Sequence, residues 1–500
     1  MDITAQLQDN LASISYFMPE FILAGVMILL MLGDMLLKRE RTPYLALAAL
    51  LGVVVALAAV LSQYSLPDRL IFNNMMVLDR FSLFFKLLFV ASIGMVILLS
   101  MSSVELSGRG VGEYFVLLIA TTLGMFWMAS STNLVTIFIS IETVSISSFA
   151  LAAYLKNVKR SSEAGLKYAI YGGFSSGLML YGISLLYGLT GTLNIYEISQ
   201  ILANGSPEKL TLFISLLLIT AGFGYKIAAV PFHFWAPDVY EGAPTPITAF
   251  LSVGPKAAGF ALLLRFFMSG VSTNVGDMWQ TVANSNWPQL LAAIAALTMT
   301  LGNLIAIVQN NIKRLLAYSS IAHAGYALMG VVVLTKDGMF ATMFYLVVYY
   351  LMNLGSFLVV IIFQQLIGSE RVQDYRGLGF RAPAVAVAMT IFLFSLTGIP
   401  LTAGFIGKFY LFAALIKGGS EYYWLAIVAG LNSVVSLYYY ARIIKAMWLE
   451  TTDTELAPLP VSIPAVVMVL VLAIPTIIFG LYWAPLSELT NYSVRLFSKS

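Results

Sequence analysis

Runs of about twenty apolar residues, each bounded by charged or turn-forming residues, recur along this 500-residue chain. A run of that length crosses a bilayer as a helix, and a helix satisfies its own backbone hydrogen bonds without water. The runs lie at residues 18–37, 43–62, 81–101, 113–130, 133–155, 166–189, 211–232, 244–268, 288–308, 314–334, 339–366, 384–415, 422–448 and 461–484. The pattern predicts an all-α integral membrane protein with about 14 transmembrane helices.

The composition points to the same class of protein. Sixty per cent of the residues are hydrophobic and 10% are charged, whereas a soluble domain carries about 25% charged residues. The absence of cysteine excludes disulfides, thiolate-bound zinc and protein-ligated iron–sulfur clusters. Two histidines without a ligand spacing predict no metal site. Asp2 and Asp9, with no basic residue before the first apolar run, predict that no signal peptide is cleaved.

Basic residues are distributed unequally between the two sets of loops. If the N-terminus lies outside, the cytoplasmic loops contain Lys38, Arg39, Arg41, Arg109, Lys156, Lys159, Arg160, Lys313, Arg314, Arg371, Arg376, Arg381, Arg442 and Lys445. The opposite loops contain, besides a few terminal residues, Arg69, Arg80, Lys209, Lys336 and Lys417. Because cytoplasmic loops are enriched in Lys and Arg, this roughly twofold bias predicts that both termini lie on the outer side.

An octapeptide with a terminal lysine occurs twice in apolar surroundings. Its first copy, at 219–226, reads Ile-Thr-Ala-Gly-Phe-Gly-Tyr-Lys, and its second, at 401–408, reads Leu-Thr-Ala-Gly-Phe-Ile-Gly-Lys. A lysine at membrane depth costs about 3 kcal/mol or more, so such a residue indicates a function by default. The placement of Lys226 and Lys408 in matching segments predicts a shared role in ion movement, with snorkelling to an interface as the alternative.

The similarity between the two halves extends beyond the octapeptide. Residues 164–168 align with 341–345, and 148–151 with 325–328, both at an offset of 177. Helices four to eight then correspond to helices nine to thirteen, and an odd number of helices per unit predicts an inverted repeat. The expected division is an N-terminal three-helix segment, two five-helix repeats and a C-terminal helix, at 1–111, 112–268, 269–449 and 450–500.

Proline predicts a break in helix seven and in helix twelve. Pro231 follows Lys226 by five residues, and Pro400 precedes Lys408 by eight. Proline removes a helical hydrogen bond, and a broken helix at membrane depth is tolerated beside protein or a watery cavity. Each repeated lysine is therefore expected beside a helix break.

Two further charges lie within predicted spans. Glu142 is in the middle of the fifth span, and Lys256 follows Pro255 in the eighth. A Glu–Lys pair at about 5 Å and an effective dielectric near 20 is coupled by about 3 kcal/mol. Making or breaking such a pair switches the lysine between holding and releasing a proton, so Glu142 and Lys256 are candidate proton carriers.

His323, in the tenth span, is either a proton relay or a hydrogen-bonded core residue. Lys86, Asp34 and Lys167 lie nearer to span ends and are expected to be snorkelling or ion-paired anchors. No dinucleotide fingerprint, Walker motif, nucleophile elbow or Cys/His metal set is present in the sequence. The chain therefore shows no means of binding NADH, ATP or a redox centre by itself.

At these residues the chain resembles the antiporter-like membrane subunits of respiratory complex I, the proton-pumping NADH:quinone oxidoreductase. These subunits are similar to subunits of multi-subunit cation/proton antiporters. The resemblance covers nearly the whole chain and is strongest from Gly224 to Pro246. The sequence Ala-Pro-Asp-Val-Tyr-Glu-Gly at 236–242 resembles that of the subunit N branch of this family, the counterpart of mitochondrial subunit 2. Lys408 also favours subunit N, since subunit M is expected to carry glutamate at this position. The sequence shows no long lateral helix of the kind that marks subunit L.

The resemblance implies a role for each candidate. Glu142 would pair with and tune Lys226, the central lysine of helix seven. Lys256 would be the connecting lysine on helix eight, and Lys408 the helix-twelve lysine that faces the outer exit. His323 is compatible with a relay role. Protons would enter from the cytoplasm, pass Lys226 and Lys256, and leave by Lys408.

The resemblance also implies the surroundings of the chain. NAD, FMN, iron–sulfur clusters and quinone would be bound in partner subunits, and this chain would have no cofactor. Its partners would be other membrane subunits of complex I, especially the antiporter-like subunit M and the small subunit K, and the lipid bilayer, without nucleic acid. The expected location is the bacterial inner (plasma) membrane. A sodium/proton antiporter subunit and a purely structural scaffold remain the alternatives.

Overall fold

The computed structural model describes residues 3–36, 42–106, 111–450 and 457–497. The helices are α1 Ile3–Ser13, α2 Met18–Leu36, α3 Thr42–Ser62, α4 Arg80–Met101, α5 Gly112–Ser130, α6 Leu134–Ala152, α7 Lys159–Thr190, α8 Ile195–Asn204, α9 Lys209–Ile227, α10 Trp235–Gly242, α11 Thr245–Gly270, α12 Trp287–Ile307, α13 Ile312–Val332, α14 Lys336–Ile367, α15 Leu378–Arg381, α16 Pro383–Thr397, α17 Ala403–Gly418, α18 Tyr423–Trp448, α19 Ile463–Leu481 and α20 Ala484–Ser493. The strands are β1 Arg69–Ile71, β2 Met76–Leu78, β3 Ser272–Val275 and β4 Met278–Thr281.

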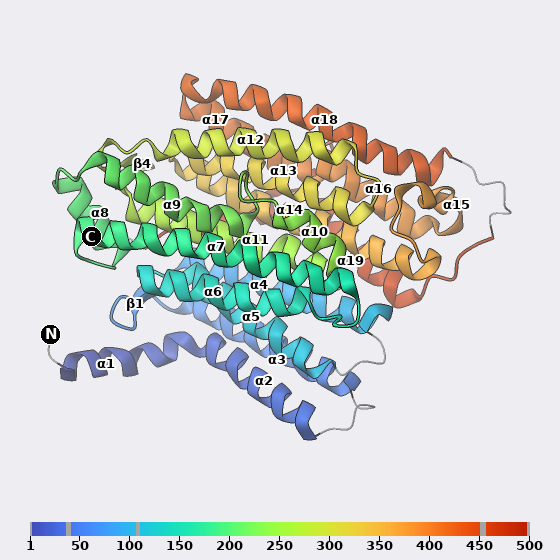
Figure 1. The fold of residues 1–500 in the computed structure, drawn as a ribbon, viewed down its shortest axis with the longest axis horizontal. Coiled ribbons are helices and arrows are strands. Elements are labelled where there is room, and N and C mark those ends of the chain that lie inside the picture. Colours follow the sequence, from blue (N-terminus) through green and yellow to red (C-terminus); the bar gives the residue numbers. More distant parts are fainter. Residues whose placement is uncertain (1–2, 37–41, 107–110, 451–456, 498–500) are drawn as a thin grey trace.

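Long apolar helices lie side by side in one bundle (Figure 1). Within the described residues, 13 helices are long and apolar enough to cross a membrane. The predicted span 384–415 is absent from that set because residues 398–402 divide it into α16 and α17. Both chain ends lie at the same end of the bundle (Figure 1), as an even number of crossings requires. The predicted class, a helical multi-pass membrane protein, is confirmed.

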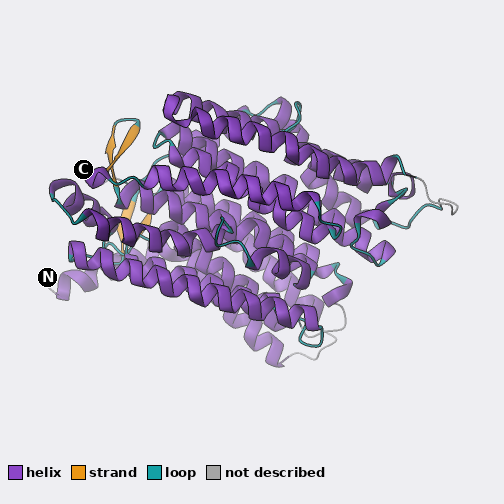
Figure 2. Cartoon of the chain, turned by 45° about the horizontal axis from the view of Figure 1, so that its top comes forward, coloured by secondary structure: helices purple, strands orange, loops and turns teal. Residues whose placement is uncertain are grey.

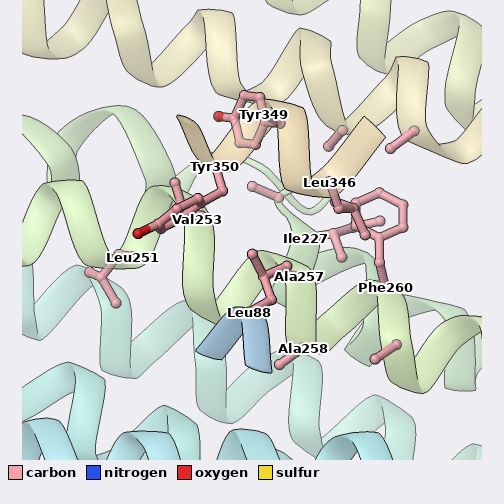
Figure 3. Packing of buried hydrophobic residues seen from close by; sticks show 14 of the residues in the cluster. Leu88, Ile227, Leu251, Val253, Ala257, Ala258, Phe260, Leu346, Tyr349 and Tyr350 are labelled. Atoms are coloured by element: carbon pink, nitrogen blue, oxygen red, sulfur yellow. The ribbon is translucent and has the colours of Figure 1, made fainter. Parts of the chain in front are cut away.

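Three helices form the centre of the bundle. The apolar segments of α11 and α13 are completely buried by the rest of the protein and that of α14 nearly so, whereas α2, α18 and α19 expose most of theirs. Figure 3 shows small and large side chains of α11, including Ala257 and Phe260, packed against Ile227 of α9 and Leu346 of α14. Because the outer helices expose large apolar side chains, their outward faces suit a lipid environment.

The strands form two short antiparallel hairpins, β1–β2 and β3–β4. Both hairpins lie at the end of the bundle that carries the termini (Figures 1 and 2). Each connects consecutive long helices, so the hairpins are surface connections within a helical fold.

Both predicted helix breaks are present, but they differ in position relative to the repeated octapeptide. The first copy is helical throughout, and the chain leaves α9 at Ala228, whose φ is 57°. In the second copy, Leu401, with a φ of 70°, lies within the break, and α17 begins two residues later. The break therefore follows Lys226 and precedes Lys408. The inverted repeat and the division into four segments stay predictions.

The basic residues used to predict orientation are only partly covered. Lys38, Arg39, Arg41 and Arg109 lie outside the described residues. The beginning of α7 and the end of α14, where several of the other basic residues lie, are at the end of the bundle opposite to the termini (Figure 1). These residues therefore gather at one end, as the predicted orientation requires.

Candidate functional site

Lys226 lies at the end of α9, one residue before the helix breaks. Its side chain is buried, and Nζ donates a hydrogen bond of 2.9 Å to Oγ of Ser145 on α6. The last carbonyl groups of a helix carry partial negative charge, which favours a cation there. Lys226 thus lies in the last turn of α9, and its ammonium group binds a hydroxyl of α6.

Glu142 lies on α6 three residues before Ser145, on the same side of the helix. Its carboxylate accepts a hydrogen bond from Oγ of Ser176 on α7. Within the described residues, no ion pair joins Glu142 to Lys226, and each has a serine hydroxyl as its hydrogen-bond partner. The structure therefore brings the two together on one face of α6, with Ser145, rather than the carboxylate, holding the lysine.

Gly259 brings Lys226 close to the next candidate. An added Cβ at Gly259 would lie 3.2 Å from Cγ of Lys226 and 2.7 Å from Cγ2 of Ile227. The lysine stem therefore crosses α11 where only glycine leaves room. Lys256 lies three residues earlier on α11, about one turn away on the same face.

Lys256 lies in the middle of α11 and is held by one residue of α13. Its Nζ donates to both the carbonyl oxygen and Oγ of Ser320, at 2.9 and 2.7 Å. The ring of Tyr240 on α10 lies 5.9 Å from the same nitrogen. Pro255 is inside the helix, as the sequence indicated. The lysine is thus fixed in the core by neutral oxygens of a neighbouring helix.

His323 lies on α13, three residues after Ser320. Its Nδ1 is 2.5 Å from the hydroxyl of Tyr345 and its Nε2 is 3.2 Å from that of Tyr440. The Tyr440 hydroxyl also forms a hydrogen bond with Ser319. Both ring nitrogens therefore have a partner that can donate or accept, which both a proton relay and a satisfied core histidine require.

Lys408 lies on α17 and crosses the second helix break. Its Nζ donates to the carbonyl oxygen of Thr397, the last residue of α16, at 2.9 Å, and to Oγ of Ser433 on α18 at 3.2 Å. Gly398 has a φ of 89°, and a Cβ there would meet Cδ of Lys408 at 2.9 Å. The break thus supplies both a carbonyl acceptor and the space for the side chain.

One face of α13 connects the last three candidates. Ser320, His323 and Tyr326 follow one another at three-residue spacing and so lie on one side of the helix. Ser320 binds Lys256, and the ring of Tyr326 lies 4.4 Å from Nζ of Lys408. His323 is between them and interacts electrostatically with both lysines. The structure therefore brings all the predicted residues of helices eight, ten and twelve to one side of α13.

The four cationic candidates share a chemical environment. Lys226, Lys256, His323 and Lys408 are each at most 5% exposed. Their hydrogen-bond partners among the described residues are neutral hydroxyl and carbonyl oxygens. A buried lysine held only by neutral groups is not locked into an ion pair. This environment suits side chains that gain and lose a proton one after another.

The sequence analysis missed the neutral partners Ser145, Ser320, Tyr345, Tyr440 and Ser433. A signal was present for two of them. Ser145 follows Glu142, and Ser320 precedes His323, by three residues within an apolar span, and that spacing places each pair on one helix face. Tyr345, Tyr440 and Ser433 come from other helices, and nothing in the sequence relates them to His323 or Lys408.

Two of the three residues predicted to be anchors, Lys86 and Lys167, are ion-paired, whereas the prediction for Asp34 stays a prediction. Lys86 of α4 and Glu20 of α2 form a buried pair, with Nζ 2.6 Å from the carboxylate. Lys167 is paired with Asp238 at 2.6 Å and with Glu163 at 2.7 Å. These contacts agree with the ion-paired alternative and place Lys86 and Lys167 outside the row of candidates.

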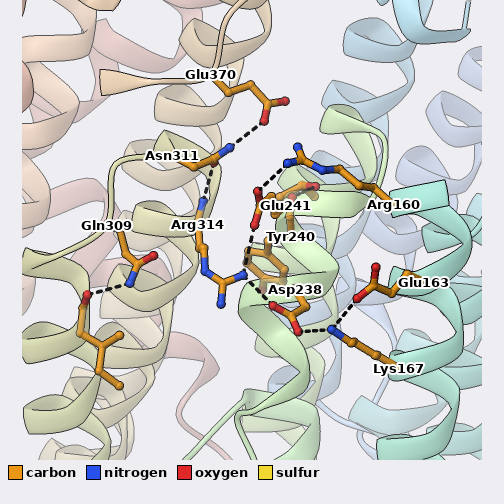
Figure 4. Close-up of polar contacts among 12 residues, drawn as sticks. Arg160, Glu163, Lys167, Asp238, Tyr240, Glu241, Gln309, Asn311, Arg314 and Glu370 are labelled. Carbon is orange, nitrogen blue, oxygen red and sulfur yellow. Dashed lines mark hydrogen bonds and ion pairs between the residues drawn. The ribbon is translucent and has the colours of Figure 1, made fainter. Parts of the chain in front are cut away.

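Charged side chains form a cluster of ion pairs and hydrogen bonds around α10 (Figure 4). We call it the α10 charge cluster, and it consists of Arg160, Glu163, Lys167, Asp238, Glu241 and Arg314. Partial burial raises the pKa of the Asp238 carboxyl, but hydrogen bonds from Lys167 and Arg314 outweigh burial and lower its pKa below the ordinary value. Since α10 follows the break after Lys226, the cluster anchors the segment into which that break leads.

Comparison with known proteins relates this geometry to a family. Residues 131–436 match the family model described as NADH:quinone oxidoreductase/Mrp antiporter, TM. NADH-quinone oxidoreductase subunit N 2 of Chloroherpeton thalassium is 47% identical, over 96% of this chain and 94% of the relative. The chain belongs to the NADH-quinone oxidoreductase subunit N family. Subunit N of Anaeromyxobacter sp. (strain Fw109-5) is 45% identical, over 98% of each chain. The sequence-based assignment to the subunit N branch is confirmed.

Solved structures extend the relation of this subunit N family member to whole complexes. A chain of respiratory complex I from Thermus thermophilus with bound aureothin is 31% identical with a TM-score of 0.78, over 94% of this chain and 98% of that chain. A chain of the membrane-bound sulfane sulfur reductase, an archaeal respiratory membrane complex, is 25% identical with a TM-score of 0.85, over 96% and 97%. A chain of the Mrp complex from Dietzia sp. DQ12-45-1b shares the fold, with a TM-score of 0.81 over 95% and 96% at 21% identity. The relatives are thus membrane subunits of multi-subunit complexes.

Proposed function

We propose that this chain translocates protons as a membrane subunit of NADH:quinone oxidoreductase, through Glu142, Lys226, Lys256 and Lys408, with His323 as a relay. The observation that supports this most is the face of α13 on which Ser320 holds Lys256 and Tyr326 contacts Lys408. Protons pass from Lys226 to Lys256 and leave by Lys408. The chain itself carries out no redox step.

Contacts among the described residues support two steps of the proposed route. Lys226 crosses α11 at Gly259, one turn from Lys256. Lys256 and His323 are connected by neighbouring turns of α13. Because cations within one low-dielectric region repel each other, a proton gained at one end favours release at the other. Redox chemistry elsewhere in the complex can in this way drive charge along the row.

The proposal includes the surroundings of the chain. Quinone reduction, and the binding of NAD, FMN and iron–sulfur clusters, belong to neighbouring subunits. The neighbours in the membrane include the antiporter-like subunit M and the small subunit K. The chain lies in the bacterial plasma membrane, with both termini on the outer side and the α10 charge cluster on the cytoplasmic side, as the loop charges favour.

Sodium/proton exchange is the second candidate, because the matching family model also describes the Mrp antiporter. The two functions differ in their energy source. Proton flux that depends on sodium and continues without NADH oxidation would favour the antiporter. Proton flux that requires NADH oxidation and is unaffected by sodium would favour the redox-driven pump.

The decisive test is proton pumping by NADH-energised everted membrane vesicles that carry Lys226→Ala. We expect the complex to assemble and its NADH dehydrogenase activity with an artificial acceptor to remain, while pumping and quinone-coupled turnover fall by about a hundredfold. Lys209→Ala is the matched control, because Lys209 is an exposed lysine at the beginning of the same helix. Normal pumping by an assembled Lys226→Ala complex would make the lysine structural.

A further inference from the structure

One asparagine of α12 connects this helix to two places on α18. Asn303 is fully buried, and its Nδ2 donates a hydrogen bond of 3.1 Å to Oδ1 of Asn432 on α18. Its Oδ1 accepts a hydrogen bond of 2.9 Å from the hydroxyl of Tyr439, about two turns further along α18. Both α18 residues are at most 6% exposed. We call Asn303, Asn432 and Tyr439 the amide network.

Both amide groups of the network are completely hydrogen-bonded. Nδ2 of Asn303 also donates to the carbonyl oxygen of Met299 at 2.9 Å. Nδ2 of Asn432 donates to Oγ1 of Thr300 on α12 at 3.1 Å and to the carbonyl oxygen of Val428 at 3.0 Å. A buried polar network whose members are all satisfied favours one arrangement of its helices, because a slip leaves amide groups unpaired.

The outward side of α18 is apolar. It carries exposed side chains that include Ile427, Leu431 and Val434. Apolar packing in a membrane has little directional preference, so it specifies the rotation and depth of a helix weakly. A buried asparagine, in contrast, can set the register between two helices. The amide network therefore suits the task of fixing α18 on its neighbour α12 (Figure 1).

The residue that follows each α18 member of the network contacts a candidate proton carrier. Oγ of Ser433 accepts a hydrogen bond of 3.2 Å from Nζ of Lys408. The hydroxyl of Tyr440 lies 3.2 Å from Nε2 of His323. Consecutive residues of a helix point about 100° apart, so the first residue of each pair faces α12 while the second faces a carrier. The register of α18 on α12 thus decides where both hydroxyl groups lie.

We propose that the amide network positions the hydroxyl groups that α18 presents to the candidate proton carriers. By fixing α18, Asn303 keeps Ser433 beside Lys408. In the same way it keeps Tyr440 beside His323. Asn303 is a positioning residue and transfers no proton itself. The inference rests on the proposed function, because it concerns the partners of two residues of the translocation route.

The test removes the amide network as a unit. The triple variant Asn303→Leu, Asn432→Leu and Tyr439→Phe deletes the bonded groups together, so no buried amide is left unpaired. Arg442, which binds carbonyl groups at the end of α12, remains to hold α18 in the bundle. In NADH-energised vesicles with assembled complex, we expect pumping and quinone-coupled turnover to fall roughly tenfold, because misplaced partners slow transfer.

A matched control and a double-mutant cycle separate positioning from packing. Ser436→Ala should pump normally, since Ser436 is a buried serine of α18 whose hydroxyl bonds a carbonyl of its own helix. Ser433→Ala with Tyr440→Phe removes the two hydroxyl groups that the network positions. Adding the triple variant to this background should cause no further loss of turnover. The same fractional loss in both backgrounds would overturn the proposal, because the network would then act through packing alone.

The other outcomes are also decisive. Normal turnover in the assembled triple variant overturns the proposal and, if Lys408→Ala is defective, leaves the proposed function standing. Normal turnover in Ser433→Ala with Tyr440→Phe also overturns the proposal, since the positioned hydroxyl groups are then not needed. Normal turnover in Lys408→Ala contradicts the proposed function, and the inference falls with it.

A milder variant serves if the triple variant does not assemble. Tyr439→Phe keeps the ring and removes only the hydrogen bond to Asn303. A loss of turnover that disappears in the background of Ser433→Ala with Tyr440→Phe supports positioning. A loss that persists there, or no loss at all, overturns the proposal.

Discussion

Each of the three central lysines is held by a serine hydroxyl, a backbone carbonyl or both. Lys226 binds Ser145, Lys256 binds Ser320, and Lys408 binds Thr397 through the carbonyl group freed by a helix break. Neutral oxygens accept a hydrogen bond from a charged or a neutral amine. An ion pair at the same place would stabilise one charge state only. Partners of this kind leave a lysine free to change its charge, as the proposed function requires.

Gly259 offers a test of lysine position that leaves every charge in place. In Gly259→Ala, the new Cβ meets the side chains of Ile227 and Lys226 and must push the lysine stem away from α11. We expect a roughly tenfold loss of proton pumping, because displacement lengthens the step toward Lys256. Pumping would be measured in NADH-energised vesicles. Gly430→Ala, at a helical glycine with open space around it, should change nothing, and a normal Gly259→Ala would show that the crossing is not required.

Among the elements, α10 connects the first helix break to the rest of the bundle. Trp235 at its beginning donates a hydrogen bond to the carbonyl of Tyr225, next to Lys226. Asp238 at its centre is paired with Lys167 of α7 and Arg314 of α13. A short helix has little stability of its own, so tertiary contacts decide its position. The ion pairs of the α10 charge cluster therefore help to fix the position of α10 and, through it, the geometry of the helix break after Lys226.

Asp238→Asn should loosen α10. We expect the stability of the assembled subunit to fall by about 1–2 kcal/mol, since two charge-assisted hydrogen bonds become weaker. Heat-induced loss of the subunit from the purified complex would measure it. Asp277→Asn is the matched control, because Asp277 is 83% exposed in its pair with Lys336 and such pairs contribute little.

The same carboxyl predicts a dependence on pH. The pKa of Asp238 is lowered in the folded protein, so its contribution is complete above the unfolded value of 3.8 and is lost as the pH falls through the folded pKa. Stability at neutral pH should therefore not vary through this group. Below about pH 4 the difference between the natural protein and Asp238→Asn should shrink, and it should disappear once the pH lies below the folded pKa. A difference that persists unchanged in acid would assign the effect to packing.

In the molecule as a whole, a buried ion pair joins the beginning of α4 to the central helix α11. Arg265 of α11 and Asp79, at the beginning of α4, form two hydrogen bonds of 2.8 and 2.9 Å, and both side chains are completely buried. Arg265 also donates to the carbonyl of Ala129 on α5. Three helices from two predicted segments thus meet at one side chain.

Arg265→Met should destabilise the subunit by about 3–5 kcal/mol, because it leaves the Asp79 carboxylate buried without its partner. Adding Asp79→Asn should recover part of that loss. The yield of assembled complex and the temperature at which the subunit dissociates would measure both effects. Arg69→Met should be nearly silent, since its pair with Asp9 is 38% and 31% exposed. Equal losses in Arg265→Met and Arg69→Met would argue against this role.

Much of the fold was predictable from local pattern. Apolar runs identified the membrane helices, because a bilayer of fixed thickness selects helix length directly. Pro231 and Pro400 indicated the two breaks, because proline acts on its own backbone. The break around 398–402 divides the predicted span 384–415 into α16 and α17, as Pro400 indicated. There Gly398 and Leu401 adopt positive φ.

The candidate charges could be named from the sequence because a lysine, glutamate or histidine inside an apolar run is conspicuous, and the energy of burying it is a property of the residue and the bilayer. Lys226, Lys256 and Lys408 needed no structure for that. Their partners did: Ser145, Ser320 and the carbonyl group of Thr397 come from other helices. Which neutral oxygen meets which buried amine depends on helix packing at long sequence separation. Only the tertiary structure decides it, because hydrogen bonds require contact within about 3 Å, which no local pattern specifies.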